Sequence, residues 1–348
     1  MNFAKTSASR NRVRATAQLM CLLLAGSLAE GTSFSDSAPK PSSYLLEEVP
    51  APHDNQLTPE RIELGKMLFF DPRLSGGGRI SCATCHNPSL GWSDGLRVAR
   101  GEDMHALKRA TPSLVNVGFN QFQMWDGRFH SLEDQVWTPM LASAEMHGLQ
   151  DEILTKLAAS PGYVAAFAKA YAGEGITRES VSKAIASFER SIVSRDAPFD
   201  RWMAGDDSAV SDSAKRGFAI FNGKGNCNAC HQGGNFTDQG FHNIGLRDDG
   251  DPGRYAITPI RISRGAFKTP TLRDVAASGP YMHNGAYRTL AEVIDHYDRG
   301  GDDRENLDPN IKPLALTAQE KKDLLEFLRT LTAPSRPFVV PQLPQAQH

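Results

Sequence analysis

Two strings of the form Cys-x-x-Cys-His specify chemistry more clearly than any other residues of this 348-residue chain. They are Cys82-Ala83-Thr84-Cys85-His86 and Cys227-Asn228-Ala229-Cys230-His231. In such a string the two thiols can bond covalently to the vinyl groups of a haem, and the adjacent histidine can ligate the iron. Zinc sites usually combine paired clusters that lie close together, whereas 145 positions (227 minus 82) separate these two strings. The sequence therefore predicts two covalently bound haem c groups.

The first 29 residues have the features of a secretory signal peptide. Basic residues, among them Lys5 and Arg14, precede an apolar stretch from position 17 to 29 that is too short to span a bilayer. Ser27-Leu28-Ala29 provides a small-x-small cleavage site, and the fifth cysteine, Cys21, falls inside the removed segment. Attachment of haem c after export agrees with this reading. We therefore expect a periplasmic protein with no membrane span after cleavage, since no other apolar run is long enough.

Composition and length limit the remaining possibilities. A formal charge of -2 provides no broad basic field, which excludes nucleic acid as a partner. The mature length suits two haem domains of roughly 130 to 150 residues each. The expected divisions are a signal peptide (1–29), an N-terminal extension (30–56), an N-terminal haem domain (57–205), a C-terminal haem domain (206–333) and a Pro-rich tail (334–348).

An internal repeat predicts that the two haem domains share one architecture. Gly65 and Phe69 precede the first haem string, and Gly217 and Phe221 precede the second, each pair as Gly-x-x-x-Phe at the end of a helical pattern. The segments between the helical patterns are long and rich in turn residues. We therefore predict a mainly α fold made of two cytochrome c-like domains with long haem-wrapping loops.

Helix signals occur in three further segments. Thr58-Pro59 combines a capping threonine with proline at the first helical position. Thr317 and Glu320 form a capping box before an apolar stripe. Positions 153 to 194 show apolar residues at three- and four-residue spacing, and Pro161-Gly162 divides this stretch into at least two helices.

A wider set of residues resembles a known family along almost the whole mature chain, from about residue 57 to residue 334. The first half contributes Trp125-Asp126-Gly127-Arg128, Gln135, Pro139 and Glu145-Met146. The second half contributes the stretches from Phe267 to Arg273 and from Pro280 to Gly285, followed by Thr289-Leu290. In these residues the chain is similar to the bacterial dihaem cytochrome c peroxidases and, within that superfamily, to the MauG-type enzymes.

The resemblance implies a peroxide reaction at the first haem. Cleavage of a bound peroxide needs an open iron face, a group that moves a proton between the two oxygens and a polar neighbour that orients them. The resemblance gives the proton transfer to Glu145 and the orientation to Gln135. It also implies that Trp125 lies between the two haems and conducts electrons. By residue type alone, these three side chains would be ordinary surface or core residues.

The iron ligands decide which branch of the family the chain resembles. Relatives that need reductive activation block the oxidised first haem with a distal histidine, and Glu102 occupies that position here. The block is therefore expected to be absent, although His105 lies three residues away and could reach the iron. At the second haem, Tyr297 stands where the electron-transfer peroxidases have a ligating methionine. Tyr297 is the predicted ligand, as in MauG-type enzymes, and Met282 is the competing candidate.

At two further positions this chain lacks a residue that is functional in the family. The resemblance implies a calcium ion between the haems, bound by the carbonyls of Ser278 and Pro280 and by an asparagine whose position is Ala110 here. One protein ligand would then be missing, and water would have to replace it. MauG oxidises its protein partner through a surface tryptophan at a position that is Gly225 here. We therefore do not transfer that activity.

Two classes of function remain after this comparison. The first is a periplasmic peroxidase that reduces hydrogen peroxide at the N-terminal haem, shares the oxidising equivalents with the C-terminal haem and takes electrons from a protein or small-molecule donor. The second is a dihaem electron carrier without peroxide chemistry, for which both irons would be six-coordinate. A carrier gains nothing from an open iron face flanked by an acid and an amide, so the sequence favours the enzyme.

Overall fold

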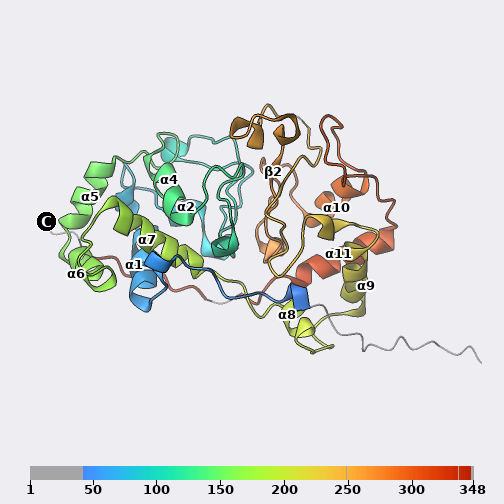
Figure 1. Ribbon diagram of the computed structural model, residues 1–348, viewed down its shortest axis with the longest axis horizontal. Coiled ribbons are helices and arrows are strands. Elements are labelled where there is room, and N and C mark those ends of the chain that lie inside the picture. Colours follow the sequence, from blue (N-terminus) through green and yellow to red (C-terminus); the bar gives the residue numbers. More distant parts are fainter. Residues whose placement is uncertain (1–41, 248, 336, 346–348) are drawn as a thin grey trace, which may run out of the picture. The chain divides into compact units, whose positions relative to one another are not determined.

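The computed structural model describes residues 42–247, 249–335 and 337–345, which belong to one compact unit. The predicted signal peptide lies outside the described residues. Most regular structure is helical, as predicted, and the two strands have two residues each (Figure 1). The α-helices are α1 (Pro59–Phe70), α2 (Cys82–Cys85), α3 (Leu132–Gln135), α4 (Trp137–Leu141), α5 (Gln150–Ala158), α6 (Pro161–Ala170), α7 (Arg178–Arg190), α8 (Pro198–Met203), α9 (Asp212–Asn222), α10 (Leu290–Asp298) and α11 (Ala318–Thr330), and the strands are β1 (Phe241–His242) and β2 (Phe267–Lys268).

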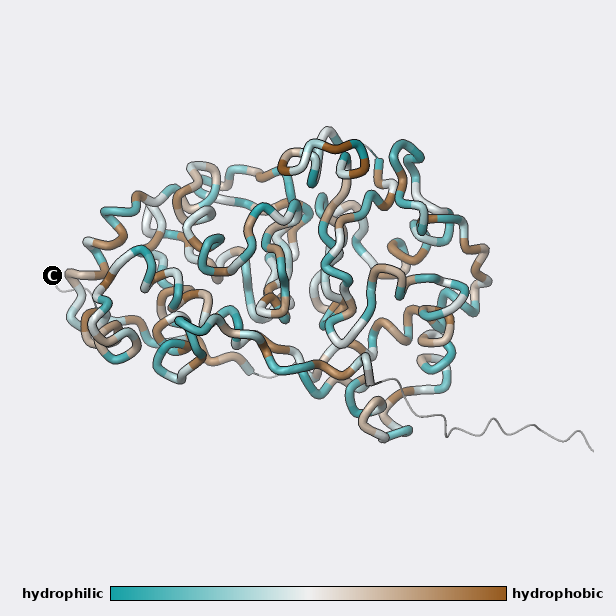
Figure 2. Tube along the Cα trace, viewed as in Figure 1, coloured by the Kyte–Doolittle hydropathy of each residue, from teal (hydrophilic) through white to brown (hydrophobic). Residues whose placement is uncertain are grey.

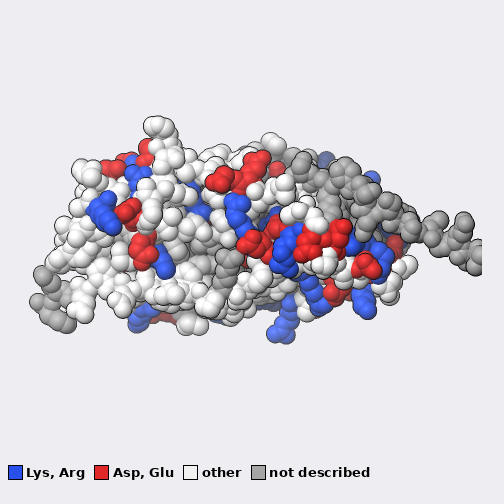
Figure 3. All heavy atoms as spheres, turned by 90° about the horizontal axis from the view of Figure 1, so that it is seen from below, with Lys and Arg blue, Asp and Glu red and all other residues white. Residues whose placement is uncertain are grey.

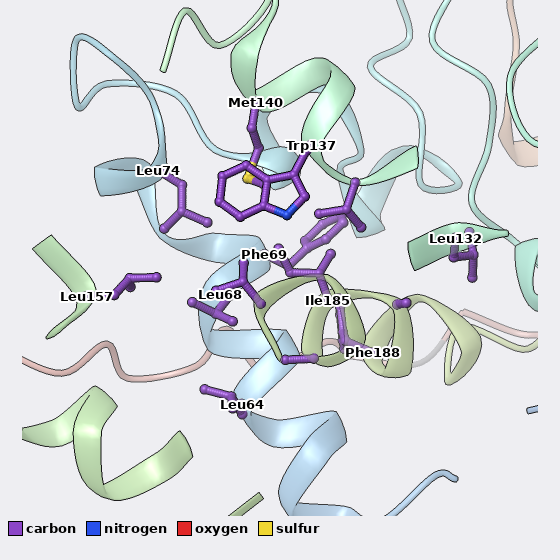
Figure 4. Packing of buried hydrophobic residues seen from close by; sticks show 14 of the residues in the cluster. Leu64, Leu68, Phe69, Leu74, Leu132, Trp137, Met140, Leu157, Ile185 and Phe188 are labelled. Carbon is purple, nitrogen blue, oxygen red and sulfur yellow. The ribbon is translucent and has the colours of Figure 1, made fainter. Parts of the chain in front are cut away.

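The first hydrophobic core forms where α1 crosses α7. A Cβ atom on Gly65 would lie 1.8 Å from the backbone oxygen of Ala184, so only glycine allows the two helices to approach this closely. One turn later, the rings of Phe69 and Phe188 pack with their centroids 5.1 Å apart. Figure 4 shows these side chains together with Trp137, which is 1% exposed. The predicted Gly-x-x-x-Phe pattern therefore marks a helix crossing.

The second core repeats this crossing with α9 and α11. A Cβ atom on Gly217 would lie 2.0 Å from the backbone oxygen of Asp323, and the rings of Phe221 and Phe327 pack 5.0 Å apart. Ala184 and Phe188 of α7 thus correspond to Asp323 and Phe327 of α11. The repeat predicted from the sequence is confirmed by two equivalent helix pairs, one beside each haem string.

The loops after each haem string repeat as well. A backbone bridge joins Gln123 to Phe129 in the first half and Tyr281 to Tyr287 in the second. Each bridge closes a turn in which a methionine has positive φ, 71° at Met124 and 75° at Met282. A short helix follows each turn, α3 in the first half and α10 in the second. This correspondence aligns Gln135 with Val293 and Pro139 with Tyr297.

The predicted helix starts agree with the structure. The side chain of Thr58 accepts a hydrogen bond from the backbone N–H of Arg61 at 3.3 Å. Thr317 and Glu320 exchange hydrogen bonds of 3.2 and 2.7 Å, which is the expected capping box. The stretch from 153 to 194 contains the end of α5 and all of α6 and α7, so the break at Pro161 is confirmed.

Both ends of the described chain pack on the haem half that is distant in sequence. Tyr44 belongs to the second core, where its ring lies 5.3 Å from that of Phe236. Phe338, from the predicted tail, stacks on Phe70 of the first core at 5.3 Å. Figure 1 shows both terminal segments running from the second half toward the first. Each end therefore connects one haem half to the other.

Apolar residues occur in short runs along the described chain, with hydrophilic positions between them (Figure 2). None of its helices combines the length and the apolar character that a bilayer crossing requires.

Candidate functional site

A cavity of about 700 Å³ lies between the loops of the two halves. Its wall includes all the residues that the sequence assigned to the haems, to catalysis, to electron transfer and to calcium. They are Cys82, Cys85, His86, Trp125, Gln135, Glu145, Cys227, Cys230, His231, Ser278, Pro280 and Tyr297. Residues more than 200 positions apart are thus brought to one enclosed space.

The two histidines of the haem strings are held in the orientation that an iron ligand needs. Nδ1 of His86 lies 3.1 Å from the carbonyl oxygen of Trp92, and Nδ1 of His231 lies 2.9 Å from that of Phe236. These contacts fix one ring nitrogen and leave Nε2 for a metal. Burial lowers the pKa of both imidazoles, which keeps them in the neutral, ligating form. All four cysteines of the strings are free of disulfide bonds. The two strings therefore fit covalently attached haem.

A different metal site beside the second string fits the structure less well. Cys230, Asp238 and His242 place potential ligand atoms within 4.8 Å of one another. However, the ring nitrogens of His242 lie 2.8 and 2.7 Å from carboxylate oxygens of Asp238 and Asp308. The hydrogen bond to Asp238 is the largest cause that raises the pKa of His242 to about 11. An imidazolium has no lone pair for a metal ion, so Cys230 is better suited to a thioether bond.

The wall of the cavity near the first string carries Glu145 and Gln135. Gln135 ends α3, and its Nε2 lies 3.7 Å from the sulfur of Met124. Glu145 follows α4, and its carboxylate has no hydrogen-bond partner among the residues that the structure describes. Burial raises the pKa of Glu145, while the charge of Arg128 opposes this effect. A carboxyl group with a raised pKa can accept and return a proton.

The two residues considered as blocking ligands of the first haem lie outside the cavity wall. Glu102 is 7% exposed, and its Oε1 forms an ion pair of 2.7 Å with Arg79. Its backbone N–H donates to the carbonyl oxygen of Glu145 at 2.6 Å. This hydrogen bond joins the loop of Glu102 to the backbone of Glu145. His105 is exposed. Among the described residues that line the cavity, His86 is the only histidine from the first half.

The wall near the second string carries Tyr297 and Met282. Tyr297 and Val293 lie one turn apart on α10, and both line the cavity. Burial is the largest cause that raises the pKa of the Tyr297 phenol, followed by charges on Cys227 and Cys230. A metal cation beside the oxygen would reverse this effect and favour the anion. Met282 lines the same wall in the turn that corresponds to that of Met124.

Trp125 lies where the backbones of the two halves meet. Its indole N–H donates to the carbonyl oxygen of Ala110 at 2.9 Å, and its own carbonyl oxygen accepts from the N–H of Lys268 at 2.8 Å. The N–H of Ala110 in turn donates to the carbonyl oxygen of His283 at 2.7 Å. Hydrogen bonds thus connect Trp125 to both halves, through its indole to Ala110 and through its backbone to Lys268.

An ion-pair network connects the halves beside Trp125. Arg109 donates to Asp251 at 2.7 and 2.8 Å and to Asp126 at 2.7 Å. Arg128 also donates to Asp126, and Arg254 donates to the carbonyl oxygens that follow Trp125, at 2.9 and 2.7 Å. The loop that carries Trp125 is therefore fixed by residues from both halves.

The predicted calcium ligands lie in the same wall. The carbonyl-bearing residues Ser278 and Pro280 line the cavity. Ala110, at the third position, brings no side-chain oxygen, and its carbonyl oxygen already accepts the N–H of Trp125. Water would have to complete the coordination of a hard cation here. Calcium remains a prediction.

Comparison with known proteins agrees with this geometry. The family described as di-haem cytochrome c peroxidase matches residues 59–208, and the family described as cytochrome c matches residues 214–332. The methylamine utilization protein MauG of Methylorubrum extorquens is 49% identical over 301 residues, which cover 86% of this chain and 85% of that protein. The chain belongs to the dihaem cytochrome c peroxidase and MauG family.

Other members of this family are similar over most of their length. The cytochrome c551 peroxidase of Pseudomonas aeruginosa is 34% identical, over 79% of this chain and 82% of that protein. A crystal structure of a MauG-like protein associated with microbial copper homeostasis has a TM-score of 0.78 and 31% identity, over 84% of this chain and 94% of that one. The predicted fold class, family and pair of haem c groups are confirmed, and this dihaem peroxidase-type protein is an oxidoreductase.

Two buried charged residues of the cavity wall were missed in the sequence. Lys268 is 8% exposed and donates to the carbonyl oxygen of Thr269 at 3.2 Å, while burial lowers its pKa to about 8. Its counterpart in the first half is Ala110. Glu189 is 6% exposed and lies at the end of α7. The available signal was its position, four residues after Ile185 on the apolar face of a helix.

Proposed function

We propose that this dihaem protein is a periplasmic peroxidase of the MauG type. It reduces hydrogen peroxide at the N-terminal haem and shares the oxidising equivalents with the C-terminal haem. The observation that carries this proposal is the carboxyl group of Glu145, which has a raised pKa, has no hydrogen-bond partner among the described residues and lines the same cavity as Gln135. It is also supported by the cavity lining, which includes neither Glu102 nor His105 among the described residues.

The haem at Cys82 and Cys85 would bind the peroxide and supply electrons for its reduction. Glu145 would take the proton from the inner oxygen and deliver it to the outer oxygen, which then leaves as water. The amide of Gln135 would orient the peroxide by donating one hydrogen bond. These two side chains come from segments joined by α4, so their relative placement depends on a helix of five residues.

The second haem would complete the reaction as a store of oxidising equivalents. Tyr297 would supply a phenolate ligand, which favours the oxidised states of iron. Trp125, which is hydrogen-bonded to both halves, would carry electrons between the two haems. Electrons would then come from a protein or small-molecule donor. On the face shown in Figure 3, acidic and basic side chains are interspersed. This face therefore has no broad basic surface of the kind that binds nucleic acid.

Glu145→Gln tests this proposal. The change keeps the size and hydrogen bonding of the side chain but removes proton transfer, so peroxide turnover should fall by about 10² to 10⁴ with haem content unchanged. Glu152→Gln is the matched control, because Glu152 undergoes the same chemical change while its side chain is 56% exposed on α5. Unchanged turnover in Glu145→Gln would favour the alternative, a dihaem electron carrier.

The resting state provides a second test. Since neither Glu102 nor His105 lines the cavity, the oxidised protein should show a high-spin signal in electron paramagnetic resonance and react with peroxide without prior reduction. A wholly low-spin protein that stays inert until it gains one electron would contradict this expectation.

A further inference from the structure

The last turn of α7 places a carboxyl group in the apolar wall of the first haem half. Glu189 is 6% exposed and lines the cavity together with Cys82 and Ile185. Its Oε2 is buried without a hydrogen-bond partner among the described residues. Burying a polar group in this way is unfavourable, and groups of this kind are rare in native proteins. Glu189 therefore calls for a role beyond packing.

The second half of the molecule shows which side chain fills the position equivalent to Glu189. Since Ala184 corresponds to Asp323 and Phe188 to Phe327, Glu189 corresponds to Leu328 of α11. Leu328 is 7% exposed and lines the cavity in the second half. An apolar side chain of similar size thus fills the same place beside the second haem string. The carboxyl group is a feature of the first site alone.

Glu189 lies within electrostatic range of the first haem attachment. Burial is the largest cause that raises the pKa of the Cys82 thiol, and a charge on Glu189 is the next. In the mature protein that sulfur joins the haem by a thioether bond, so the carboxyl group lies near the haem edge. A charge at this place would change in energy whenever the haem gains or loses an electron.

The cation that acts on Glu189 is already paired with another carboxylate. The charged groups that act on it are Arg190 of the same helix and Glu133 of α3. Arg190 already donates to both oxygens of Glu133, at 2.6 and 2.8 Å. Helix α1 faces this part of α7 with Phe69, which carries no charge. Burial raises the pKa of Glu189 to about 8, which lies within the range of physiological pH.

We propose that Glu189 is a redox-linked proton site of the first haem. Its carboxylate takes up one proton from solvent when the haem at Cys82 gains one electron, and the carboxyl group returns the proton when the electron leaves. The physical reason is that reduction removes one positive charge near the carboxylate and weakens the attraction that favours its ionised form. The proposal depends on haem attachment at Cys82 and not on peroxide reduction, so either can fail without the other.

The test is the reduction potential of each haem as a function of pH, in the wild type, Glu189→Gln and Glu189→Leu. In the wild type, the potential of the first haem should fall as pH rises between the two pKa values of Glu189. The slope should approach one tenfold change in equilibrium constant per pH unit, or 59 mV for one electron. Both variants should lose this slope at the first haem and leave the second haem unchanged, since Leu328 already occupies the equivalent place there.

An unaltered slope at the first haem in either variant would overturn the proposal. Glu189→Leu is expected to fold, because the second half carries leucine at the same position of an equivalent helix pair. Redox difference infrared spectroscopy of the wild type provides an independent measurement. A carboxylic acid band should appear on reduction and be missing in Glu189→Gln. Absence of that band from the wild type would also overturn the proposal.

Discussion

Replacing Arg109 with alanine should lower the free energy of unfolding through loss of the ion pairs between the two halves. Arg109 forms three hydrogen bonds of 2.7 to 2.8 Å with Asp126 and Asp251, which lie 17 and 142 positions away in sequence. Asp126 keeps its bonds to Arg128 in the variant, whereas Asp251 loses its paired cation. The variant therefore leaves one carboxylate without a counter-charge.

The burial of these side chains sets the magnitude. The side chains of Asp251 and Asp126 are 10% and 3% exposed, and that of Arg109 is 19% exposed. Removing one partner of a fully buried pair costs about 3–5 kcal/mol, whereas pairs on the surface contribute about 0–1 kcal/mol. Since solvent reaches Arg109 in part, we expect a loss of about 2 kcal/mol at pH 7.

This loss should depend on pH in a defined direction. Burial raises the pKa of Asp251, but the hydrogen bonds from Arg109 and from the backbone N–H of Gly253, together with the charge of Arg109, outweigh it, so the folded-state pKa lies below its usual value. Such a group stabilises the fold above the unfolded pKa of about 3.9, and this contribution is lost as pH falls through the folded-state pKa. Without Arg109, burial raises the pKa instead, and the carboxyl group becomes protonated in mild acid. The difference between variant and wild type should therefore shrink from pH 7 to pH 4.

Urea denaturation of the holoprotein, followed by circular dichroism at pH 7 and pH 4, measures both effects. Lys169→Ala is a suitable control, because Lys169 is 72% exposed and lies 3.6 Å from Glu60. It should show no measurable change. A loss below about 0.5 kcal/mol in Arg109→Ala, or an equal loss at both pH values, would refute the reasoning.

Three further predictions concern the haem sites. Tyr297→Phe should raise the reduction potential of the second haem, whereas Met282→Leu should leave its potential and spectrum unchanged; the opposite pattern in spectroelectrochemistry would make the methionine the ligand. The double change Cys227→Ala with Cys230→Ala should halve the haem that resists acid-acetone extraction, and complete extraction from the wild type would exclude haem c. Glu189→Leu should raise the free energy of unfolding by about 1–3 kcal/mol in urea denaturation, because it removes an unpaired buried carboxyl group; a loss of stability would mean that the carboxyl group has a partner in the holoprotein.

Features carried by a few neighbouring residues could be predicted from the sequence. A haem string needs five consecutive residues, and a capping box joins Thr317 to Glu320 across one turn. The Gly-x-x-x-Phe repeat predicted two units of one architecture, and the structure shows that its glycines lie where helices cross closely. The resemblance to a family also allowed Gln135, Glu145 and Tyr297 to be predicted as site residues. All three line the wall of one cavity in the structure.

The tertiary structure decided which distant residues meet. Nothing local to Arg109 indicates that its partner is Asp251, since the pair forms only when two separate loops pack together. Likewise, only the structure shows that Glu189 lines the cavity and that a leucine fills the equivalent place in the other half. Both features arise from contacts between segments far apart in the chain, where side-chain packing and desolvation set the energy. The energies of packing and desolvation cannot be predicted from residues that are neighbours in the sequence.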